Sequence, residues 1–384
     1  MTGSSRLLPR AKELAMSPTV GRTMPRPLFA VILAGGVGTR LWPRSRRRCP
    51  KQLLDIVNRR TMLQNTVDRV LPLIPAERIF VVTGAEYAAQ AHEQLPNLPE
   101  GNILVEPSGR GTAPCIGLAA MALAKIEPEG IMISLHADHV IANPDRFREL
   151  LQIAAQTASS GRLVTLGIEP TYPETGYGYI ERGRYIHRVS GVPVYKVAGF
   201  IEKPPAAQAA EYVLGGRHFW NSGLFVWRVD IILQAIQQWL PELYEQIMLI
   251  GQAWGTPEQD QVLAKVWDGI HNVSIDVGIM EKAADIAVVP ADIGWSDVGS
   301  WASLADIMEA NGEGNVVLGD TEHLSIETRG SLVYAPGRVV ATIAVEDLVV
   351  VDTDDVLLIC PKSRAQDVRK VIDKLQALGR HDLL

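Results

Sequence analysis

The chain has 384 residues, of which 47% are hydrophobic and 21% charged, and its net charge is −6. This is the composition of a globular protein, which excludes disorder for the bulk of the chain. The length predicts a large domain together with a smaller one. The negative charge disfavours nucleic-acid binding, because nucleic-acid-binding proteins are usually basic. The apolar runs are all shorter than the ~20 residues of a membrane-spanning helix, so we expect no membrane association.

The cysteines and the N-terminal segment indicate where the protein resides. Cys49, Cys115 and Cys360 form no C-x-x-C pair. This pattern disfavours a disulfide framework and structural zinc, and it favours a reducing compartment, so we expect a cytoplasmic protein. Residues 1–26 are basic and lack the apolar core of a signal peptide. We therefore expect a disordered tail over 1–26.

Strands and helices are predicted to alternate over the first half of the chain. The expected strands are 28–33, 79–83, 102–105, 131–135 and 162–168, and the expected helices are 61–73, 86–94, 114–125 and 144–159. Alternation of this kind is typical of βαβ units, which build a doubly wound α/β sheet with helices on both faces. The sequence therefore predicts a Rossmann-like α/β domain.

The pattern changes in the second half of the chain. Short alternating segments over 176–203 predict an antiparallel insertion, and helices are expected at 205–214, 229–239 and 258–267. A turn-rich stretch at 311–315 predicts a domain boundary, with the larger domain over 27–310 and a small β-rich domain over 311–384. Within the small domain we expect stacked strands and a final amphipathic helix over 364–378. The expected strands are 315–318, 331–334, 339–345, 348–352 and 356–359.

A glycine-rich loop follows the first strand and contains Gly35, Gly36 and Gly38. Successive N–H groups in such a loop form a concave site for anions. Segment 28–54 contains five Arg and one Lys but no Asp or Glu, which suits a polyphosphate. The loop is not a P-loop, because no Lys-Ser/Thr pair follows the glycines. Leu41 replaces the third glycine of a dinucleotide-binding loop, so a Rossmann dehydrogenase remains only the alternative at the level of the fold.

Several further motifs follow this loop in one order along the chain. They are GTAP at 111–114, ADH at 137–139, PETGYGYI at 173–180, FIEKP at 200–204, WNSGLF at 220–225, SID at 274–276 and WSDVGSW at 295–301. With segment 31–54, they resemble the mannose-1-phosphate guanylyltransferases, within the sugar-1-phosphate nucleotidyltransferase family. The resemblance covers roughly residues 28–380. It implies a glycosyltransferase-A-like mixed sheet with a small C-terminal β-helix-like domain.

The resemblance also implies a reaction. GTP and mannose 1-phosphate would give GDP-mannose and pyrophosphate, with Mg²⁺ or Mn²⁺ as the cofactor and a homodimer as the working form. A sugar-phosphate oxygen would attack the α-phosphorus in line with the leaving pyrophosphate. This nucleophile is already an anion, so the enzyme would act by positioning and by neutralising charge rather than through a general base.

The resemblance assigns roles to five charged residues. Arg40 and Lys51 would bind the phosphates of the nucleotide, and Lys203 would hold the sugar phosphate. Asp138 and Asp297 would hold the metal ion. Asp138 also follows a predicted buried strand at its C-terminal end, where the ligands of open α/β sheets bind.

Further residues are expected to bind the substrates. Gly178, Glu202 and Asn221, together with Lys203, would bind the sugar phosphate. The base would be recognised by Leu33, Ala34 and Gly35 and by segment 106–114. The full set expected to bind the nucleotide is Leu33, Ala34, Gly35, Gly36, Gly38, Thr39, Arg40, Thr112, Ala113 and Pro114.

Two alternatives concern function rather than fold. The enzyme could use another sugar 1-phosphate, such as that of glucose or a heptose, or another base. The chain could also be a non-catalytic homologue that binds GDP-mannose as a regulatory subunit. Such a homologue would be expected to lose Arg40, Asp138, Lys203 or Asp297, and all four are present.

Overall fold

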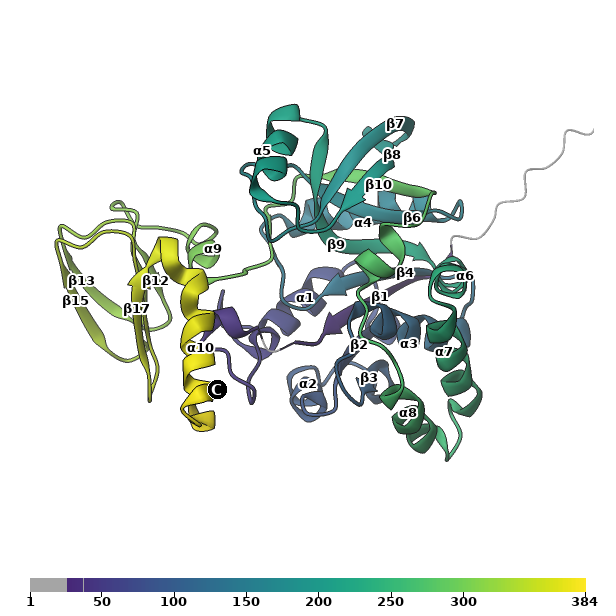
Figure 1. Cartoon of the computed structure of the whole chain (residues 1–384), viewed down its shortest axis with the longest axis horizontal. Coiled ribbons are helices and arrows are strands. Elements are labelled where there is room, and N and C mark those ends of the chain that lie inside the picture. The colour runs from purple at the N-terminus through teal and green to yellow at the C-terminus, as the bar shows by residue number, and fades with distance from the viewer. Residues whose placement is uncertain (1–25, 37) are drawn as a thin grey trace, which may run out of the picture.

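The computed structural model describes residues 26–36 and 38–384 (Figure 1). The disordered tail predicted over 1–26 therefore lies, apart from residue 26, outside the described residues. None of the described helices is both long enough and apolar enough to cross a membrane.

A mixed sheet that contains nine of the described strands forms the centre of the protein, in the order β3-β2-β1-β4-β9-β6-β10-β8-β7. Strands β1 to β4 pair in parallel, whereas β9 runs antiparallel to both β4 and β6. The strands are β1 (Leu28–Ala34), β2 (Ile79–Gly84), β3 (Ile103–Glu106), β4 (Ile131–His136), β6 (Leu163–Ile168), β7 (Tyr179–Val189), β8 (Val192–Ile201), β9 (His218–Arg228) and β10 (Ile286–Ala291). The predicted doubly wound mixed sheet is confirmed.

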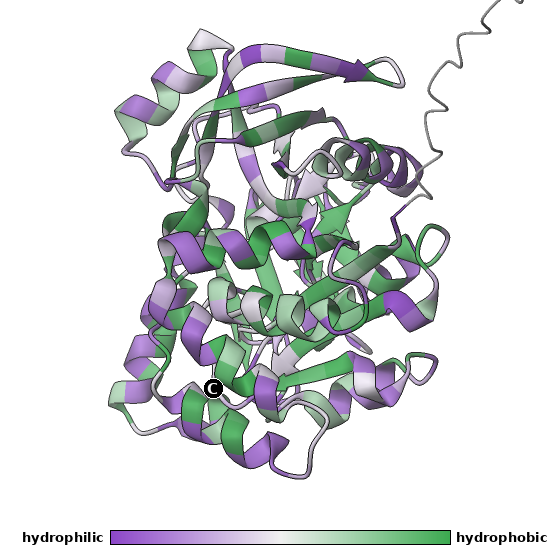
Figure 2. Ribbon diagram, turned by 90° about the vertical axis from the view of Figure 1, so that its right-hand side faces the viewer, coloured by the Kyte–Doolittle hydropathy of each residue, from purple (hydrophilic) through white to green (hydrophobic). Residues whose placement is uncertain are grey.

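Both faces of this sheet are covered by helices, which explains the continuous apolar run in β1. Its alternate residues enter two separate cores: Ala30 and Ile32 lie in one, and Phe29 and Val31 in the other. The first core is closed by α1 (Met62–Val70), α2 (Ala88–Gln94) and α4 (Pro144–Ala158). The second is closed by α3 (Thr112–Ala124), α6 (Val229–Trp239), α7 (Pro241–Ala253) and α8 (Gln259–Asp268). Figure 2 shows mainly green strands behind helices that carry both purple and green residues.

The predicted antiparallel insertion is the β7–β8 hairpin, followed by α5 (Ala206–Gly215). The sequence prediction missed β9, β10 and α7. β9 has the polar residues Asn221 and Ser222 and also Gly223 in its middle, which hides the strand pattern. α7 starts at Pro241 directly after α6, and Leu240 caps both helices.

Stacked strands form the C-terminal part of the chain, as predicted, and they pair in parallel except for the last one, which runs antiparallel to its neighbour. Val316 pairs with Leu332, and Leu332 pairs with Val349, so successive strands lie in register. The strands are β12 (Val316–Leu318), β13 (Glu322–Ile326), β14 (Leu332–Tyr334), β15 (Val339–Ile343), β16 (Leu348–Asp352) and β17 (Leu357–Pro361), of which β13 was not predicted. The chain continues through a 3-10 helix, Lys362–Asp367, into α10 (Val368–Ala377).

A third core joins this β-helical part to the segment that follows the glycine-rich loop. It contains Leu41 and Trp42 together with Trp301 from α9 (Trp301–Ala305). The Trp301 Nε1–H donates to the carbonyl of Trp42 at 3.0 Å, and the Trp42 Nε1–H donates to the carbonyl of Leu383 at 2.7 Å. The C-terminal part of the chain therefore holds the segment after β1 in place.

Removing the central side chain of this third core should destabilise the protein. Trp301 is fully buried, so Trp301→Ala should lower the free energy of unfolding by about 3–5 kcal/mol, since it leaves a cavity and an unpaired carbonyl. Leu357→Ala is the control, because Leu357 is 58% exposed, and it should change that free energy by less than about 0.5 kcal/mol. Urea unfolding followed by circular dichroism measures both, and equal effects would contradict the packing argument.

Candidate nucleotide and sugar-phosphate site

A pocket of about 310 Å³ lies at the carboxyl ends of β1 and β4, the edge where open α/β sheets bind ligands. It brings together six residues that the sequence analysis assigned to the site: Gly38, Thr39, Arg40, Lys51, Asp138 and Asp297. Three segments distant in the chain therefore contribute to one polar pocket. These are the loop after β1, the end of β4, and the turn after β11 (Trp295–Ser296).

Lys51 connects two of these segments. Its side chain is only 6% exposed, and its Nζ donates to Oδ2 of Asp138 at 3.0 Å. The same Nζ also donates to the backbone carbonyl of Asp297. Gly38 makes room for this side chain, because a Cβ at Gly38 would lie 2.4 Å from the Lys51 Cβ. Gly38 also has a φ of 65°, a conformation that favours glycine.

The carboxyl group of Asp138 is held in its ionised form. Burial alone would raise the pKa of this group, but the charge of Lys51 and the hydrogen bond from Lys51 lower it well below its usual range. Asp138 therefore remains a carboxylate near neutral pH and can bind a cation.

Asp297 is oriented by two donors. Its Oδ1 accepts hydrogen bonds from the Tyr177 hydroxyl at 2.7 Å and from the Gly299 backbone N–H at 3.0 Å. Burial, and then the charge of Asp297, raise the pKa of Tyr177 well above its usual range. The phenol therefore stays protonated and keeps donating to the carboxylate.

The two carboxylates fit a divalent cation. Among the described residues, no donor reaches Oδ1 of Asp138 or Oδ2 of Asp297, while both side chains line the same pocket. Carboxylate oxygens are the ligands that Mg²⁺ and Mn²⁺ prefer. These two residues could therefore hold such an ion between them.

Two imidazoles lie beside Asp138. Potential ligand atoms of His136, Asp138 and His139 all lie within 4.8 Å of one another. The Trp295 Nε1–H donates to Nδ1 of His139 at 3.2 Å, so the neutral His139 ring carries its proton on Nε2 and offers no lone pair there. His139 therefore presents an N–H rather than a lone pair on Nε2.

A second group of predicted residues meets where β7 starts and β8 ends, beside the middle of β9. A Cβ at Gly178 would lie 2.5 Å from Oε2 of Glu202 and 3.2 Å from the Cβ of Asn221, so only glycine leaves this space open. The Asn221 Nδ2–H donates to Oδ1 of Asp276 at 2.8 Å. Burial, and then the charge of Glu202, raise the pKa of Asp276. Asp276 lies in a recognised motif, but the sequence analysis gave it no role.

Lys203 belongs to this second group rather than to the pocket around Lys51. Its ammonium pairs with the Glu202 carboxylate, and its side chain is 59% exposed. It has a φ of 49°, unusual for a residue with a side chain. Lys203 is not among the described residues that line the 310 Å³ pocket.

The start of the glycine-rich loop is fixed by a residue that the sequence analysis missed. The Gln52 Nε2–H donates to the carbonyls of Ala34 and Gly36, both at 3.0 Å. Leu33 and Ala34 are buried at the end of β1, and Gly35 follows them. Gln52 comes directly after Lys51, and only the folded chain brings it against the loop.

Glu106 lies across from this loop, at the end of β3. Its Oε2 accepts from the Cys115 thiol at 3.0 Å, and a Cβ at Gly35 would lie 3.4 Å from its Oε1. Burial raises the pKa of Glu106, and the hydrogen bond from Cys115 opposes this shift. Among the described residues, no donor reaches Oε1.

The predicted nucleotide-binding residues at the start of α3 do not line the 310 Å³ pocket. The Ala113 N–H donates to the carbonyl of Val273 at 3.1 Å, and the Thr112 hydroxyl accepts from the Ile275 N–H at 2.8 Å. Pro114 has no N–H group to offer. In this structure the polar groups of 112–114 therefore hold the helix start against segment 273–275.

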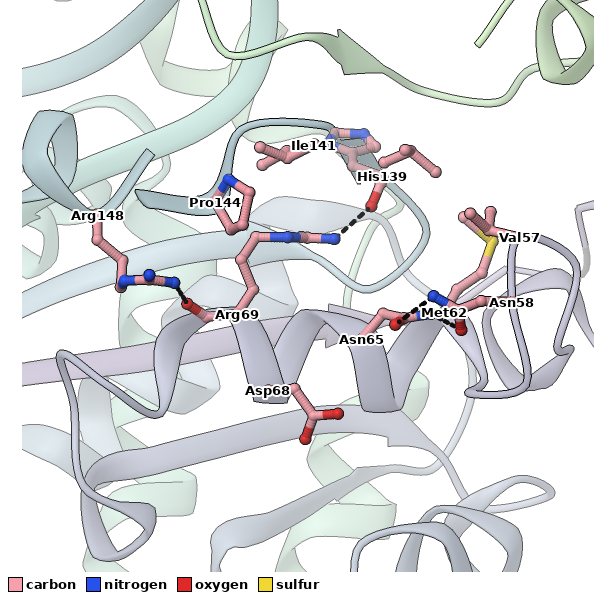
Figure 3. Close-up of a pocket in the computed structure, with 11 residues that line it drawn as sticks. Val57, Asn58, Met62, Asn65, Asp68, Arg69, His139, Ile141, Pro144 and Arg148 are labelled. Carbon is pink, nitrogen blue, oxygen red and sulfur yellow. Dashed lines mark hydrogen bonds between the residues drawn. The ribbon is translucent and has the colours of Figure 1, made fainter. Parts of the chain in front are cut away.

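A second pocket, of about 290 Å³, lies beside His139 (Figure 3). The Arg69 guanidinium points to the backbone of the Asp138–His139 turn and donates to the carbonyl of His139 at 3.2 Å. Burial lowers the pKa of Arg69 to about 10. None of the predicted site residues lines this pocket. Arg69 therefore stabilises the turn that carries Asp138, through the backbone of that turn.

The C-terminal helix supplies one more side chain to the main pocket. Arg369 of α10 lines it together with Thr39 and Arg40. Helical periodicity predicts that this helix is amphipathic, but it does not show which of its polar residues meets a distant loop.

Comparisons with known proteins cover nearly all of the chain. Residues 29–313 match the family model described as nucleotidyl transferase, and residues 321–375 match a MannoseP isomerase/GMP-like beta-helix domain. The chain is 41% identical over 363 residues to the mannose-1-phosphate guanylyltransferase of Escherichia coli K12, covering 92% of this chain and 75% of that protein. Identity to ManC of Salmonella typhimurium LT2 is also 41%, covering 92% and 74%.

A solved structure agrees with these relatives. The crystal structure described as mannose-1-phosphate geranyltransferase from Thermus thermophilus superposes with a TM-score of 0.82 at 35% identity. The match covers 91% of this chain and 99% of that one. The nucleotidyltransferase match, the β-helix match and the 41% identity agree with the resemblance carried by the motifs. The chain therefore belongs to the mannose-1-phosphate guanylyltransferase family of nucleotidyltransferases.

Proposed function

We propose that this protein transfers GMP from GTP to mannose 1-phosphate and releases pyrophosphate, and that it needs a divalent cation. One observation carries the proposal: Arg40, Lys51 and two carboxylates, Asp138 and Asp297, line a single pocket at the ligand-binding edge of the sheet. The reaction brings two polyanions together, and it needs such a set of charges. The predicted homodimer and cytoplasmic location remain predictions.

The chemical step needs alignment more than proton transfer. An oxygen of the sugar phosphate forms a bond to the α-phosphorus, the bond from that phosphorus to the bridging oxygen breaks, and pyrophosphate leaves with the electron pair. The attacking oxygen is already negatively charged, so no side chain has to remove a proton. The protein contributes by orienting the two substrates and by neutralising charge that would otherwise repel them.

Lys51, Arg40 and the two carboxylates have different roles in orienting the substrates and neutralising their charge. Lys51 is buried between Asp138 and the backbone of Asp297, so it fixes their separation and directs positive charge at the reacting phosphates. Arg40 presents a planar guanidinium to phosphate oxygens. A Mg²⁺ or Mn²⁺ ion bound by the two carboxylates would neutralise phosphate charge when present.

The second group of residues suits the sugar phosphate. Glu202 and Asp276 offer acceptors for hydroxyl groups, and Asn221 offers both a donor and an acceptor. The space over Gly178 lets a ring approach the backbone. Lys203, paired with Glu202, has an exposed ammonium that a phosphate group can reach.

Glu106 supports the choice of guanine. The Watson–Crick edge of guanine presents two adjacent donors, N1–H and the N2 amino group, and a carboxylate presents two adjacent acceptors. Glu106 lies over Gly35, within the two segments expected to recognise the base, and its Oε1 has no donor among the described residues.

The proposal is tested by pyrophosphate release from purified protein with Mg²⁺ or Mn²⁺. GTP, ATP, UTP and dTTP are each paired with mannose, glucose and galactose 1-phosphates. We expect release only with GTP and mannose 1-phosphate. Release with another pair would keep the reaction type but refute the substrates. No release with any pair, with GDP-mannose still binding, would favour the regulatory homologue.

Loss of either metal-binding carboxylate should stop turnover. Asp138→Asn and Asp297→Asn should each lower kcat/KM at least about 100-fold, because charge stabilisation at the reacting phosphates is lost. The amide of Asp297→Asn still accepts from Tyr177, so this variant should remain folded. Initial rates across a Mg²⁺ titration measure the effect, and the exposed Asp292→Asn is the control. Wild-type activity in both variants would refute the metal assignment.

Lys203→Ala should impair use of the sugar phosphate selectively. We expect the KM for mannose 1-phosphate to rise about 10-fold or more, because a charged hydrogen bond to phosphate is lost, while the KM for GTP changes less than about twofold. Steady-state kinetics with each substrate varied in turn measures both constants. Lys282→Ala, at an exposed lysine, is the control and should change neither. An unchanged KM for mannose 1-phosphate would rule out this role.

Glu106→Gln should weaken recognition of the 2-amino group of guanine. The wild type should prefer GTP to inosine triphosphate, which lacks this group, by about 10-fold or more, and the variant should lose most of that preference. Competition kinetics with the two nucleotides measures it. Cys115→Ala removes only the thiol that donates to Glu106, so it should keep the preference. A preference retained in Glu106→Gln would place base recognition elsewhere.

A further inference from the structure

The C-terminal helix α10 is packed against the loop that follows β1. Val368 and Ile372 are buried in the same core as Leu41 and Trp42. Figure 1 shows the yellow helix beside the purple segment of the chain, on the far side of that segment from β7 and β8. The helix is therefore a wall of the nucleotide pocket, although it belongs to the β-helical part of the chain.

Arg369 is the side chain that this wall contributes. It lies between the two buried residues of the helix, is itself exposed, and lines the pocket with Thr39 and Arg40. Two other cations of this region, Arg364 and Lys370, both pair with Asp367. Among the described residues, no acidic group lies within ion-pair distance of Arg369 and no hydrogen bond involves it. A cation without a partner at the edge of a polar pocket fits an anionic ligand.

We propose that Arg369 binds the phosphates of GTP that leave as pyrophosphate, so that the C-terminal helix completes the nucleotide site. This inference rests on the proposed function. A guanidinium binds two phosphate oxygens at once, which makes arginine suited to this contact. The pocket needs that charge, because Lys51 already donates to Asp138 and the Asp297 carboxylate also faces the ligand.

The geometry of in-line attack indicates which phosphates of GTP lie next to Arg369. The nucleophile and the leaving group lie on opposite sides of the α-phosphorus. The sugar group, built from Gly178, Glu202 and Asn221, lies at the start of β7, the end of β8 and within β9. The leaving group must therefore face away from those strands. Arg369 enters the pocket from α10, which lies away from β7 and β8 (Figure 1), and thus from the side of the leaving pyrophosphate.

This position predicts a difference between substrate and product. GTP and pyrophosphate both contain the leaving group, whereas GDP-mannose and mannose 1-phosphate lack it. Arg369 should therefore strengthen the binding of GTP and pyrophosphate but not that of GDP-mannose. If Arg369 acted only in folding or through the overall charge of the surface, its loss would weaken the binding of all these ligands to a similar extent.

The test measures equilibrium binding of GTP, pyrophosphate and GDP-mannose to the full chain by titration calorimetry with Mg²⁺. For Arg369→Ala we expect the Kd for GTP and for pyrophosphate to rise about 10-fold, with the Kd for GDP-mannose within about twofold of wild type. Arg369→Lys should recover part of the loss. Lys370→Ala removes one positive charge from the next residue and should leave all three values unchanged.

Three outcomes would each overturn the inference. They are an equal rise in the Kd for GTP and for GDP-mannose in Arg369→Ala, an unchanged Kd for GTP in that variant, and the same rise in the Kd for GTP in Lys370→Ala. If circular dichroism shows that Arg369→Ala is unfolded, the same three Kd values are measured for Arg369→Gln, which keeps a long side chain. The same changes are expected for that variant. Wild-type protein that binds neither GTP nor GDP-mannose would overturn the proposed function itself. The two failures are therefore distinguishable.

Discussion

The buried ammonium of Lys51 is the contact on which the candidate site depends. It joins the Asp138 carboxylate, at the end of β4, to the backbone of Asp297, in a turn far along the chain. A charge with so little exposure is stable only when it is paired and hydrogen-bonded, so the fold must hold both partners in place. Gly38 and Arg69 serve this constraint, since one makes room for the lysine stem and the other supports the Asp138–His139 turn.

The loop after β1 is shared between the two parts of the chain, which gives the β-helical part a role in the site. Trp42 donates to the carbonyl of Leu383 and accepts from Trp301, and Arg46 forms two hydrogen bonds with Asp355, at 2.6 and 2.5 Å. The conformation of the glycine-rich loop is thus set partly by segments that follow it by hundreds of residues. A small domain that fixes the loop can also place a side chain such as Arg369 beside it.

Strands β1 to β4 and β6 were predictable because their residues are buried on both faces, as the two cores around β1 show, whereas the parallel strand β10 was not predicted. The contiguous motifs also carried most of the pocket, from Gly38 to Asp297. Positions that depend on packing between distant segments were not predictable. Gln52 and Arg369 have no local signature, and only the folded chain brings them to the glycine-rich loop, whereas Glu106 lies in the segment 106–114 that was expected to recognise the base. The polar middle of β9 hid that strand, since the residues expected to bind the sugar interrupt its apolar pattern.

Four of the six cations of the loop segment do not line the 310 Å³ pocket. Residues 28–54 lack Asp and Glu, but Arg44 pairs with Asp55 and Arg46 pairs with Asp355, so these cations stabilise the loop instead of facing a ligand. The pocket itself offers Arg40, Lys51 and Arg369 against two carboxylates. That excess of about one positive charge is small beside the roughly four negative charges of a triphosphate. In the proposed function, a divalent cation held by Asp138 and Asp297 would provide the remaining neutralisation, because the protein's own cations do not suffice.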